Sequence, residues 1–384
     1  MTSCAAALSR HPVVAQATGE VVGSVLEQIG EAPDLAVVFA DSGRTGALED
    51  VMATIGTLVR PRVLVGSTAS MVAGTQHEVE DAPAIAVLAA RFPEVDDPTV
   101  PVRLQSISTS EGEAVPGLPD IGDQPRTLVL IADPFSLRVD LVLDALATRA
   151  PGLTIVGGMA SAARAPGGNR LVLDGRLHDD GAVGALLPAG LDTRAVVSQG
   201  CRPIGDPMVV TKAASSLIEE LASEPALPRL LRLIEGLDTD ERALAARGLH
   251  LGVVVDERKD TFGPGDFLVR NVLGAVRERE AIAVGAEVEV GTVVQFQVRD
   301  ASTADAELRA LLSGVDAAGA LLFTCNGRGT AFFGTADHDA AAVADVSGGA
   351  VAGMACAGEL GPIGTRAFVH GFTASVLLFA AGKG

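Results

Sequence analysis

The sequence contains no tryptophan and no tyrosine, and aromatic residues make up only 3% of its 384 positions. Proteins that hold single-stranded nucleic acids commonly stack the bases on such side chains, so base stacking is not expected. Basic charge is scarce as well, because 29 Lys and Arg residues accompany 48 Asp and Glu residues and leave a net charge of −19. A surface this acidic repels phosphate backbones and anionic lipids. We therefore expect neither nucleic acid nor a membrane surface among the partners.

Long apolar runs are also missing. The longest ones, such as residues 376–381, fall far short of the ~20 residues that a membrane-spanning helix needs. The N-terminus has no basic region followed by an apolar core, as a secretory leader would have. These features predict a cytoplasmic protein without membrane insertion.

Cysteine occurs four times, too rarely and too widely spaced for a disulfide framework. The four are Cys4, Cys201, Cys325 and Cys356, and no two of them form the C-x-x-C pair that is typical of zinc sites. No Walker A loop, no H-E-x-x-H motif and no dinucleotide-binding glycine motif after a first strand occurs either. We therefore predict neither a metal site nor a cofactor.

The remaining composition is that of a globular protein. Hydrophobic residues make up 48% of the chain and charged residues 20%, and the mean hydropathy is +0.36. Such values exclude a disordered chain, and the length suffices for two or three domains of ~100–200 residues each. Because aromatic residues are few, the core must consist mainly of Ala, Val and Leu.

One pattern occurs three times along the chain. Each copy has an apolar run that ends in Asp or Asn, then a helical stretch, a second strand with a Gly-rich end, and a third apolar run. The first runs are residues 35–41, 127–133 and 320–326, the second runs 65–70, 156–161 and 351–356, and the third runs 84–90, 181–187 and 373–379. We interpret the copies as repeated β-α-β-β units. They predict helix-covered sheets in two domains, hence an α/β or α+β fold.

A segment rich in Gly and Pro separates the first two copies from the third. Residues 199–207 (QGCRPIGDP) predict a loop at a domain boundary. Helices are predicted after it at residues 213–222 and 227–237, the second with an apolar stripe that should pack on a sheet.

The third copy carries the largest group of chemically active side chains, at the ends of its first two strands. The candidate ligand-binding residues are Cys325, Asn326, Arg328, Gly329, Cys356, Gly358, Glu359 and His370. Strands joined by a β-α-β crossover are parallel, so neighbouring strands bring their loops together at the sheet edge where α/β proteins bind ligands. We predict that a small polar molecule binds there, with Arg328 holding a carboxylate or phosphate beside flexible glycines.

These residues also have structural alternatives. Arg328 and Glu359 could form an ion pair that only ties the two loops together. Cys325 could be a nucleophile if a neighbouring cation lowered its pKa, but cysteine is more commonly a small buried residue, and no residue is assigned as catalytic. The alignment of the copies places two small residues at its position, Ala40 and Ala132. His370 is expected to be a hydrogen-bonded structural histidine.

Two groups of acidic residues and histidine resemble metal ligands but have simpler explanations. Asp337, His338 and Asp339 predict the start of a helix, with Asp337 as its N-cap. Residues 178–181 predict a tight turn between two strands.

Several strings resemble the two domains of the FIST family. Residues 156–161 (VGGMAS), 171–187 and 198–205 are similar to its N-terminal domain, and residues 323–329 (FTCNGRG), 352–364 and 368–379 to its C-terminal domain. Together with the loop at 199–207, the resemblance predicts four parts of the chain. They are an N-terminal segment at 1–33, a FIST N-terminal domain at 34–200, a linker at 201–212 and a FIST C-terminal domain at 213–384.

The resemblance implies a sensory role in signal transduction, with small ligands such as amino acids. We expect a soluble module that binds a small polar ligand and reports its occupancy to a signalling protein. An amino acid would place its carboxylate on Arg328 and its ammonium group on Glu359. Two alternatives stay open. One is a cysteine-dependent enzyme that uses Cys325, and the other is a protein-interaction scaffold without a ligand.

Overall fold

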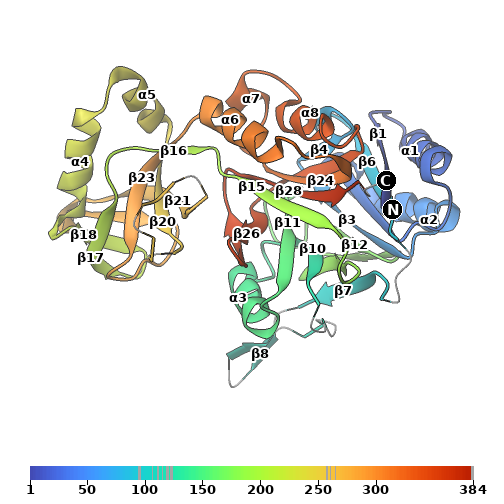
Figure 1. Cartoon of the computed structure of the whole chain (residues 1–384), viewed down its shortest axis with the longest axis horizontal. Helices are drawn as coiled ribbons and strands as arrows, with labels where there is room; N and C mark the ends of the chain where they lie inside the picture. Colours follow the sequence, from blue (N-terminus) through green and yellow to red (C-terminus); the bar gives the residue numbers. More distant parts are fainter. Residues whose placement is uncertain are drawn as a thin grey trace. The chain divides into compact units, whose positions relative to one another are not determined.

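The chain forms two compact units (Figure 1). The computed structural model describes residues 1–381 except 94–96, 106, 110–111, 115, 118–120, 122–123, 257, 260 and 264. The first unit comprises Met1–Val197, Leu308–Val369 and Thr373–Gly384, and the second Ser198–Glu307 with His370–Phe372. The second unit is therefore inserted into the sequence of the first. Residues 382–384 of the predicted C-terminal domain lie outside the described residues.

The first unit contains three six-stranded mixed sheets, numbered here in the order in which their central strands occur. Sheet 1 has the order β1 (Ser3–Ser9), β6 (Ile85–Arg91), β2 (Leu35–Asp41), β3 (Val63–Ala69), β12 (Leu171–Leu173) and β13 (Arg176–His178). Sheet 2 has the order β27 (Arg366–His370), β26 (Glu359–Ile363), β11 (Leu153–Met159), β10 (Arg126–Ala132), β14 (Ala182–Leu186) and β7 (Val100–Leu104). Sheet 3 has the order β15 (Thr193–Ser198), β28 (Ala374–Ala380), β24 (Ala317–Cys325), β25 (Val351–Cys356), β4 (Met71–Gly74) and β5 (His77–Glu80). A separate hairpin joins β8 (Ile107–Thr109) and β9 (Gly112–Ala114).

The three sheets share one arrangement of strands. A parallel pair lies at the centre of each, formed by β2 and β3, β10 and β11, or β24 and β25. An antiparallel strand follows on one side, and a hairpin from elsewhere in the chain adds to the other. The hairpin β4–β5 comes from the N-terminal part of the chain but pairs with β25 in sheet 3. In the same way β12–β13 joins sheet 1 and β26–β27 joins sheet 2, so the three sheets are interlocked.

The inner faces of the three sheets enclose one shared core. Phe39 of sheet 1, Val129 of sheet 2 and Phe323 of sheet 3 all belong to it and are fully buried. The rings of Phe39 and Phe323 meet edge to face at 6.0 Å between centroids. Because helices cover the outer faces, the central strands are buried on both sides, which explains their continuous apolar runs.

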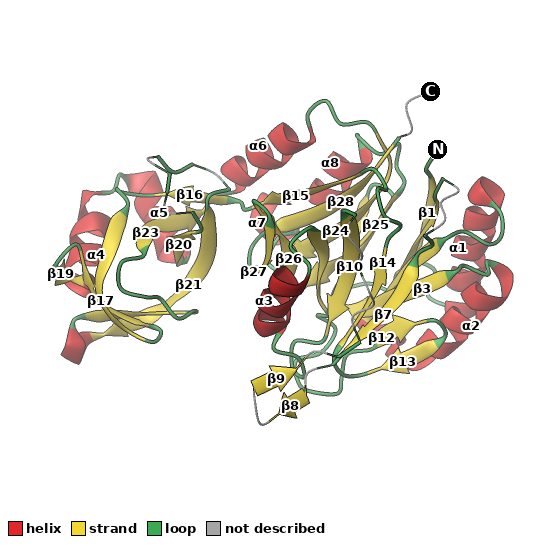
Figure 2. Cartoon of the chain, turned by 60° about the horizontal axis from the view of Figure 1, so that its bottom comes forward, coloured by secondary structure: helices red, strands yellow, loops and turns green. Residues whose placement is uncertain are grey.

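Helices cover the outer face of each sheet (Figure 2). The helices of this unit are α1 (Val14–Ile29) and α2 (Leu48–Leu58) on sheet 1, α3 (Val139–Arg149) on sheet 2, and α8 (His338–Ala344) on sheet 3. The last residues of α6 (Ala301–Leu312), from Leu308 onward, also belong to this unit and pack on sheet 3. The short helices η1 (Ser42–Ala47) and α7 (Thr330–Phe333) follow the first central strand of sheets 1 and 3. Helix α1 ends at Gly30, whose φ of 75° suits a residue without a side chain.

The described residues of the second unit form a small closed sheet with two α-helices and one short 3-10 helix. Its strands are β16 (Cys201–Pro203), β17 (Met208–Ala214), β18 (Leu217–Leu221), β19 (Glu224–Pro225), β20 (Leu249–Val254), β21 (Phe267–Val276), β22 (Ala281–Val284) and β23 (Val293–Arg299). Because β20 pairs with both β21 and β23, six of these strands close into a ring. Its helices are α4 (Ala226–Gly236), α5 (Thr239–Arg247) and the short η2 (Arg277–Arg279).

The mixed α/β fold predicted from the sequence is confirmed, with sheets and helices in two units. The helix predicted at 213–222 is wrong, because these residues end β17 and form β18. Their Ala, Glu and Leu content favours a helix, but Ile218 and Leu221 are buried in the core of the ring, and this packing overrides local propensity. The loop predicted at 199–207 contains β16. The division of the chain at residues 201–212 stays a prediction.

Candidate functional site

The two loops predicted to form the site lie side by side at the end of sheet 3. Strands β24 and β25 are parallel neighbours, and Cys325 faces Cys356 in their register. The backbone N–H of Asn326 donates to the carbonyl oxygen of Cys356 at 3.0 Å, which ties the two strand ends together. Continuous hydrogen bonding of the parallel pair therefore places the polar residues of both loops at one edge.

A cleft of about 280 Å³ opens beside the first of these loops. The loop residues 326–329 form one wall, and Ser70, Glu80 and Asp81 from the N-terminal part of the chain contribute to the other. Glu80 and Asp81 reach this position because the hairpin β4–β5 extends sheet 3. The hairpin was not recognised in the sequence as part of the site, since no local signal links it to a strand so distant along the chain.

One oxygen of Glu80 holds the hairpin on the loop. Its Oε1 accepts hydrogen bonds from both the backbone N–H and the hydroxyl of Thr330, each at 2.9 Å, at the start of α7. A Cβ atom on Gly329 would lie only 2.9 Å from this oxygen, so a side chain at position 329 would push the Glu80 carboxylate out of its present place. Among the described residues, Oε2 of Glu80 and the carboxylate of Asp81 have no hydrogen-bond partner. Two carboxylates with unused acceptor oxygens therefore line the cleft, and Thr330 holds the one on Glu80.

A second set of hydrogen bonds joins the hairpin to α8. The Glu78 carboxylate accepts from the backbone N–H of Ala340 at 3.0 Å, and the backbone N–H of Glu78 donates to Asp337 at 2.7 Å. Asp337 also pairs with His77 at 3.1 Å. The predicted helix start with Asp337 at the N-cap position is confirmed, but the Asp337 carboxylate makes no cap hydrogen bond to α8 and binds the hairpin instead.

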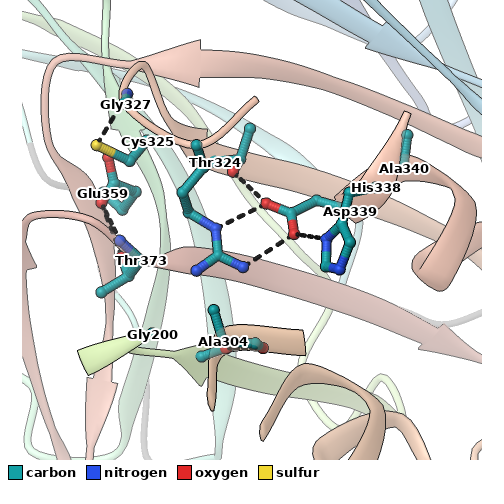
Figure 3. Close-up of polar contacts among 12 residues, drawn as sticks. Gly200, Ala304, Thr324, Cys325, Gly327, His338, Asp339, Ala340, Glu359 and Thr373 are labelled. Atoms are coloured by element: carbon teal, nitrogen blue, oxygen red, sulfur yellow. Dashed lines mark hydrogen bonds and ion pairs between the residues drawn. The ribbon is translucent and has the colours of Figure 1, made fainter. Parts of the chain in front are cut away.

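Arg328 is buried and its charge is balanced by Asp339. The guanidinium donates from Nε and Nη2 to the two carboxylate oxygens of Asp339 at 2.8 and 2.9 Å. The two side chains are 0% and 1% exposed. Thr324 and His338 bond the same carboxylate at 2.6 and 2.9 Å, as Figure 3 shows around Asp339. Burial would raise the pKa of Asp339, but the Arg328 charge and these hydrogen bonds outweigh it and hold the pKa well below its usual range.

Glu359 lies in a separate buried group with Cys325 and Thr373 (Figure 3). Its Oε2 accepts from the backbone N–H and hydroxyl of Thr373 at 3.0 and 2.8 Å. Its Oε1 is buried without a partner of standard hydrogen-bond geometry among the described residues. The Cys325 thiol also interacts with the Glu359 carboxylate. Burial raises the pKa of Glu359 to about 8, against the lowering effects of Thr373, Arg328 and Cys325.

The structure thus divides the predicted site residues into two groups. Those that line the cleft are Asn326, Arg328 and Gly329. Those outside its lining are Cys325, Cys356, Gly358, Glu359 and His370, all of them buried. Because side chains alternate along a strand, Thr324 and Cys325 point to opposite faces of sheet 3. The carboxylate that pairs with Arg328 is Asp339, which the sequence reading treated only as part of a helix start.

Equivalent positions in the three sheets differ by one residue from the sequence alignment. The backbone N–H groups of Asp41, Asp133 and Cys325 each donate to the carbonyl just before the third strand of their sheet, at 3.1, 2.8 and 2.9 Å. Cys325 therefore corresponds to Asp41 and Asp133. The predicted equivalence with Ala40 and Ala132 is wrong, because an alignment of short apolar runs does not define their register.

Comparison with known proteins covers most of the chain. The FIST N domain model matches residues 34–224, and the FIST C domain model matches residues 226–362. An uncharacterized protein of Mycobacterium tuberculosis is 40% identical over 380 residues, which are 97% of this chain and 98% of that protein. An uncharacterized protein of Mycobacterium bovis is 41% identical over 377 residues, which are 96% of each chain.

Among the residues that the structure describes, no helix is long and apolar enough to cross a membrane. No group of three or more His, Cys, Asp or Glu side chains within the same residues could hold a metal ion.

Proposed function

Since the chain belongs to the FIST family, whose domains are generally sensory and signal-transduction domains, we propose that it senses a small polar ligand that binds in the cleft beside residues 326–329. Ligand occupancy is reported to a signalling protein. The cleft volume of about 280 Å³ suits a metabolite of amino-acid size, at the lower end of ligand pockets.

The charges around the cleft favour a ligand with a positively charged amino group. Glu80 and Asp81 present carboxylate oxygens that no described residue uses. Arg328 is the basic residue of the lining, but its charge is already balanced by Asp339 at 2.8 Å. An ammonium group between the two carboxylates would form charge-assisted hydrogen bonds, which are about twice as strong as neutral ones. This imbalance of charge is the observation that carries the proposal.

An amino acid would bind here in a different orientation from the one expected from the sequence. Its ammonium group would lie on Glu80 and Asp81, and its carboxylate would meet the side-chain amide of Asn326. Glu359 takes no part, because it is fully buried outside the cleft. The negative net charge of the chain adds to the preference for a cationic group.

The proposal is tested by dye-based thermal shift with a panel of amino acids, simple amines and N-acetylated amino acids. A ligand at 100 times its Kd stabilises the protein by about 2.7 kcal/mol. The shift should occur with wild type, decrease strongly in Asp81→Asn, and persist in the control Glu49→Gln, which alters an exposed acid on α2. Equal shifts with free and N-acetylated amino acids, or an unchanged response of Asp81→Asn, would refute recognition of an amino group.

A further inference from the structure

Two cysteines lie next to each other in sheet 3, away from the cleft. Cys325 and Cys356 are register partners on the parallel strands β24 and β25. Adjacent strands are about 4.7–4.9 Å apart, within the roughly 4.4–6.8 Å between Cα atoms that a disulfide bridges. Both side chains point to the inner face of sheet 3. Cys325 is two residues from Phe323 and Cys356 is two residues from Met354, and both of these neighbours lie in the core that the three sheets share. Both are reduced in the structure and take part in no disulfide.

The fold does not require sulfur at these positions. In sheet 1 the residue equivalent to Cys325 is Asp41, and it faces Ala69 rather than a cysteine. The carboxylate of Asp41 accepts hydrogen bonds from the backbone N–H groups of Gly43 and Ala84, at 2.9 and 2.8 Å. A thiol is a poor acceptor by comparison. Sheet 3 therefore has two adjacent thiols where sheet 1 has a structural carboxylate and an alanine.

The surroundings of Cys325 contain the groups that a reactive thiol needs. Thr373 holds Oε2 of Glu359 through two hydrogen bonds. Oε1 of Glu359 is buried and accepts no hydrogen bond of standard geometry from the described residues, and the Cys325 thiol interacts with this carboxylate. The backbone N–H of Gly327 donates to Sγ of Cys325 at 3.4 Å, which favours negative charge on sulfur. The buried Arg328 guanidinium interacts electrostatically with the same thiol. A base, its orienting residue and two groups that stabilise a thiolate are thus present.

We propose that Cys325 and Cys356 form a dithiol that hydroperoxides oxidise to a disulfide, with Glu359 as the proton acceptor. This chemistry does not depend on the ligand cleft. In the first step the ionised form of Glu359, which predominates only above a pKa of about 8, takes the thiol proton of Cys325, and the sulfur attacks one oxygen of hydrogen peroxide. The S–O bond forms as the O–O bond breaks, and the leaving hydroxide takes the proton from Glu359 to become water.

The second step uses the neighbouring strand. Sγ of Cys356 attacks the sulfenic sulfur of Cys325, the S–S bond forms, and the S–O bond breaks. The departing hydroxide and the thiol proton of Cys356 combine as a second water, so that two thiols and one peroxide yield one disulfide and two waters. The two sulfurs together lose two electrons, which the peroxide gains. Burial raises the pKa of Cys356 well above its usual range, in keeping with its role as the second thiol to react.

Burial should make the reaction selective for small oxidants. Cys325 is 6% exposed and Cys356 is 0% exposed, so a maleimide is excluded, and we expect only an oxidant as small as hydrogen peroxide to reach the Cys325 thiol. Cys4 and Cys201 are only partly buried and serve as internal controls. In the folded protein we expect hydrogen peroxide to convert Cys325 and Cys356 into a disulfide, while a maleimide leaves both unmodified.

The experiment treats the full chain with hydrogen peroxide, blocks the remaining thiols, and maps disulfides by non-reducing peptide mass spectrometry. Cys325 and Cys356 should be joined in wild type and in the double control Cys4→Ser/Cys201→Ser. Cys356→Ser should stop at a sulfenic acid on Cys325, which dimedone traps when the oxidised protein is unfolded in its presence. Glu359→Gln should slow the first step by about tenfold or more.

Two results would overturn the proposal. One is a wild-type protein in which Cys325 stays reduced after the partly buried Cys201 has been oxidised. The other is a disulfide that joins Cys325 or Cys356 to a different cysteine. Both results are read on wild type, so the conclusion does not depend on whether Glu359→Gln folds.

Discussion

Replacing Asp339 by asparagine tests whether the ion pair between Arg328 and Asp339 is shielded from water, as its burial indicates. The substitution keeps the shape of the side chain but removes the charge that faces a fully buried guanidinium at 2.8 and 2.9 Å. Breaking a buried ion pair by removing one partner costs about 3–5 kcal/mol, because the other charge stays buried and unbalanced. Asp339 also accepts hydrogen bonds from Thr324 and His338, which places the expected loss toward the upper end of that range.

The matched control is an ion pair of the same composition on the surface. Arg366 and Asp144 are 2.8 Å apart, but their side chains are 54% and 63% exposed. Asp144→Asn should therefore change the free energy of unfolding by less than about 1 kcal/mol. Urea unfolding followed by far-UV circular dichroism suits both variants, since the chain has no tryptophan or tyrosine to report by fluorescence.

The pH dependence of the two variants adds a second readout. The pKa of Asp339 is lowered in the folded state, so its contribution to stability is complete above the unfolded value of 3.8 and is lost as the pH falls through the folded pKa. At neutral pH the full difference in the free energy of unfolding between Asp339→Asn and wild type should therefore be measured. A loss below about 1 kcal/mol in Asp339→Asn, equal to that of Asp144→Asn, would refute the claim that Arg328 is held in a desolvated pair.

Three further predictions concern other buried or close contacts. The folded pKa of Glu359 is raised to about 8, above the unfolded value of 4.5. The contribution of its proton to the free energy of unfolding is therefore complete below pH 4.5 and is lost as the pH rises through the folded pKa. Stability should fall by up to about 1.4 kcal/mol per pH unit as the pH rises toward 8, and denaturant titrations of Glu359→Gln should lack this slope. A Cβ on Gly158 would lie 2.2 Å from Sγ of Cys356, so Gly158→Ala should cost about 1–3 kcal/mol. In thermal unfolding, the double variant Gly158→Ala/Cys356→Ala should regain part of the stability that Gly158→Ala loses. If it regains none, the loss comes from the backbone at Gly158 and not from the contact with Cys356. Glu80→Ala should lose about 1 kcal/mol, because the start of α7 loses its acceptor, whereas Glu49→Ala on α2 should not.

Much of the fold could be predicted because each central strand can be recognised from its own short stretch of sequence. Strands β2 and β25 are continuous apolar runs, and their burial on both faces demands such runs. Helix α4 follows from an apolar stripe at helical spacing. The same kind of reasoning failed at residues 213–222, where a segment rich in helix formers pairs as strands. Local propensity differs by less than about 1 kcal/mol per residue among ordinary side chains, so packing in a closed sheet overrides it.

The candidate site could be predicted only on one of its two walls. Arg328 and Asn326 follow the end of β24 directly, and a parallel neighbour at β25 is expected from a β-α-β connection. The other wall could not be predicted, because Glu80 bonds Thr330 across 250 positions of the sequence. The pairing of Arg328 with Asp339 was missed for a related reason. Both residues were interpreted within their own loop or helix, and only the fold places them against each other.

The amino-acid sequence alone determined which segments become the central strands of the three large sheets, the mixed α/β class and the family to which the chain belongs. Apolar runs and short motifs carry that information, since each depends on residues close together along the chain. Tertiary structure decided which hairpin extends which sheet, which carboxylate balances the buried arginine, and which thiols become neighbours. Those outcomes depend on the register of strands that are distant in sequence, because a shift of one residue turns every side chain of a strand to the opposite face.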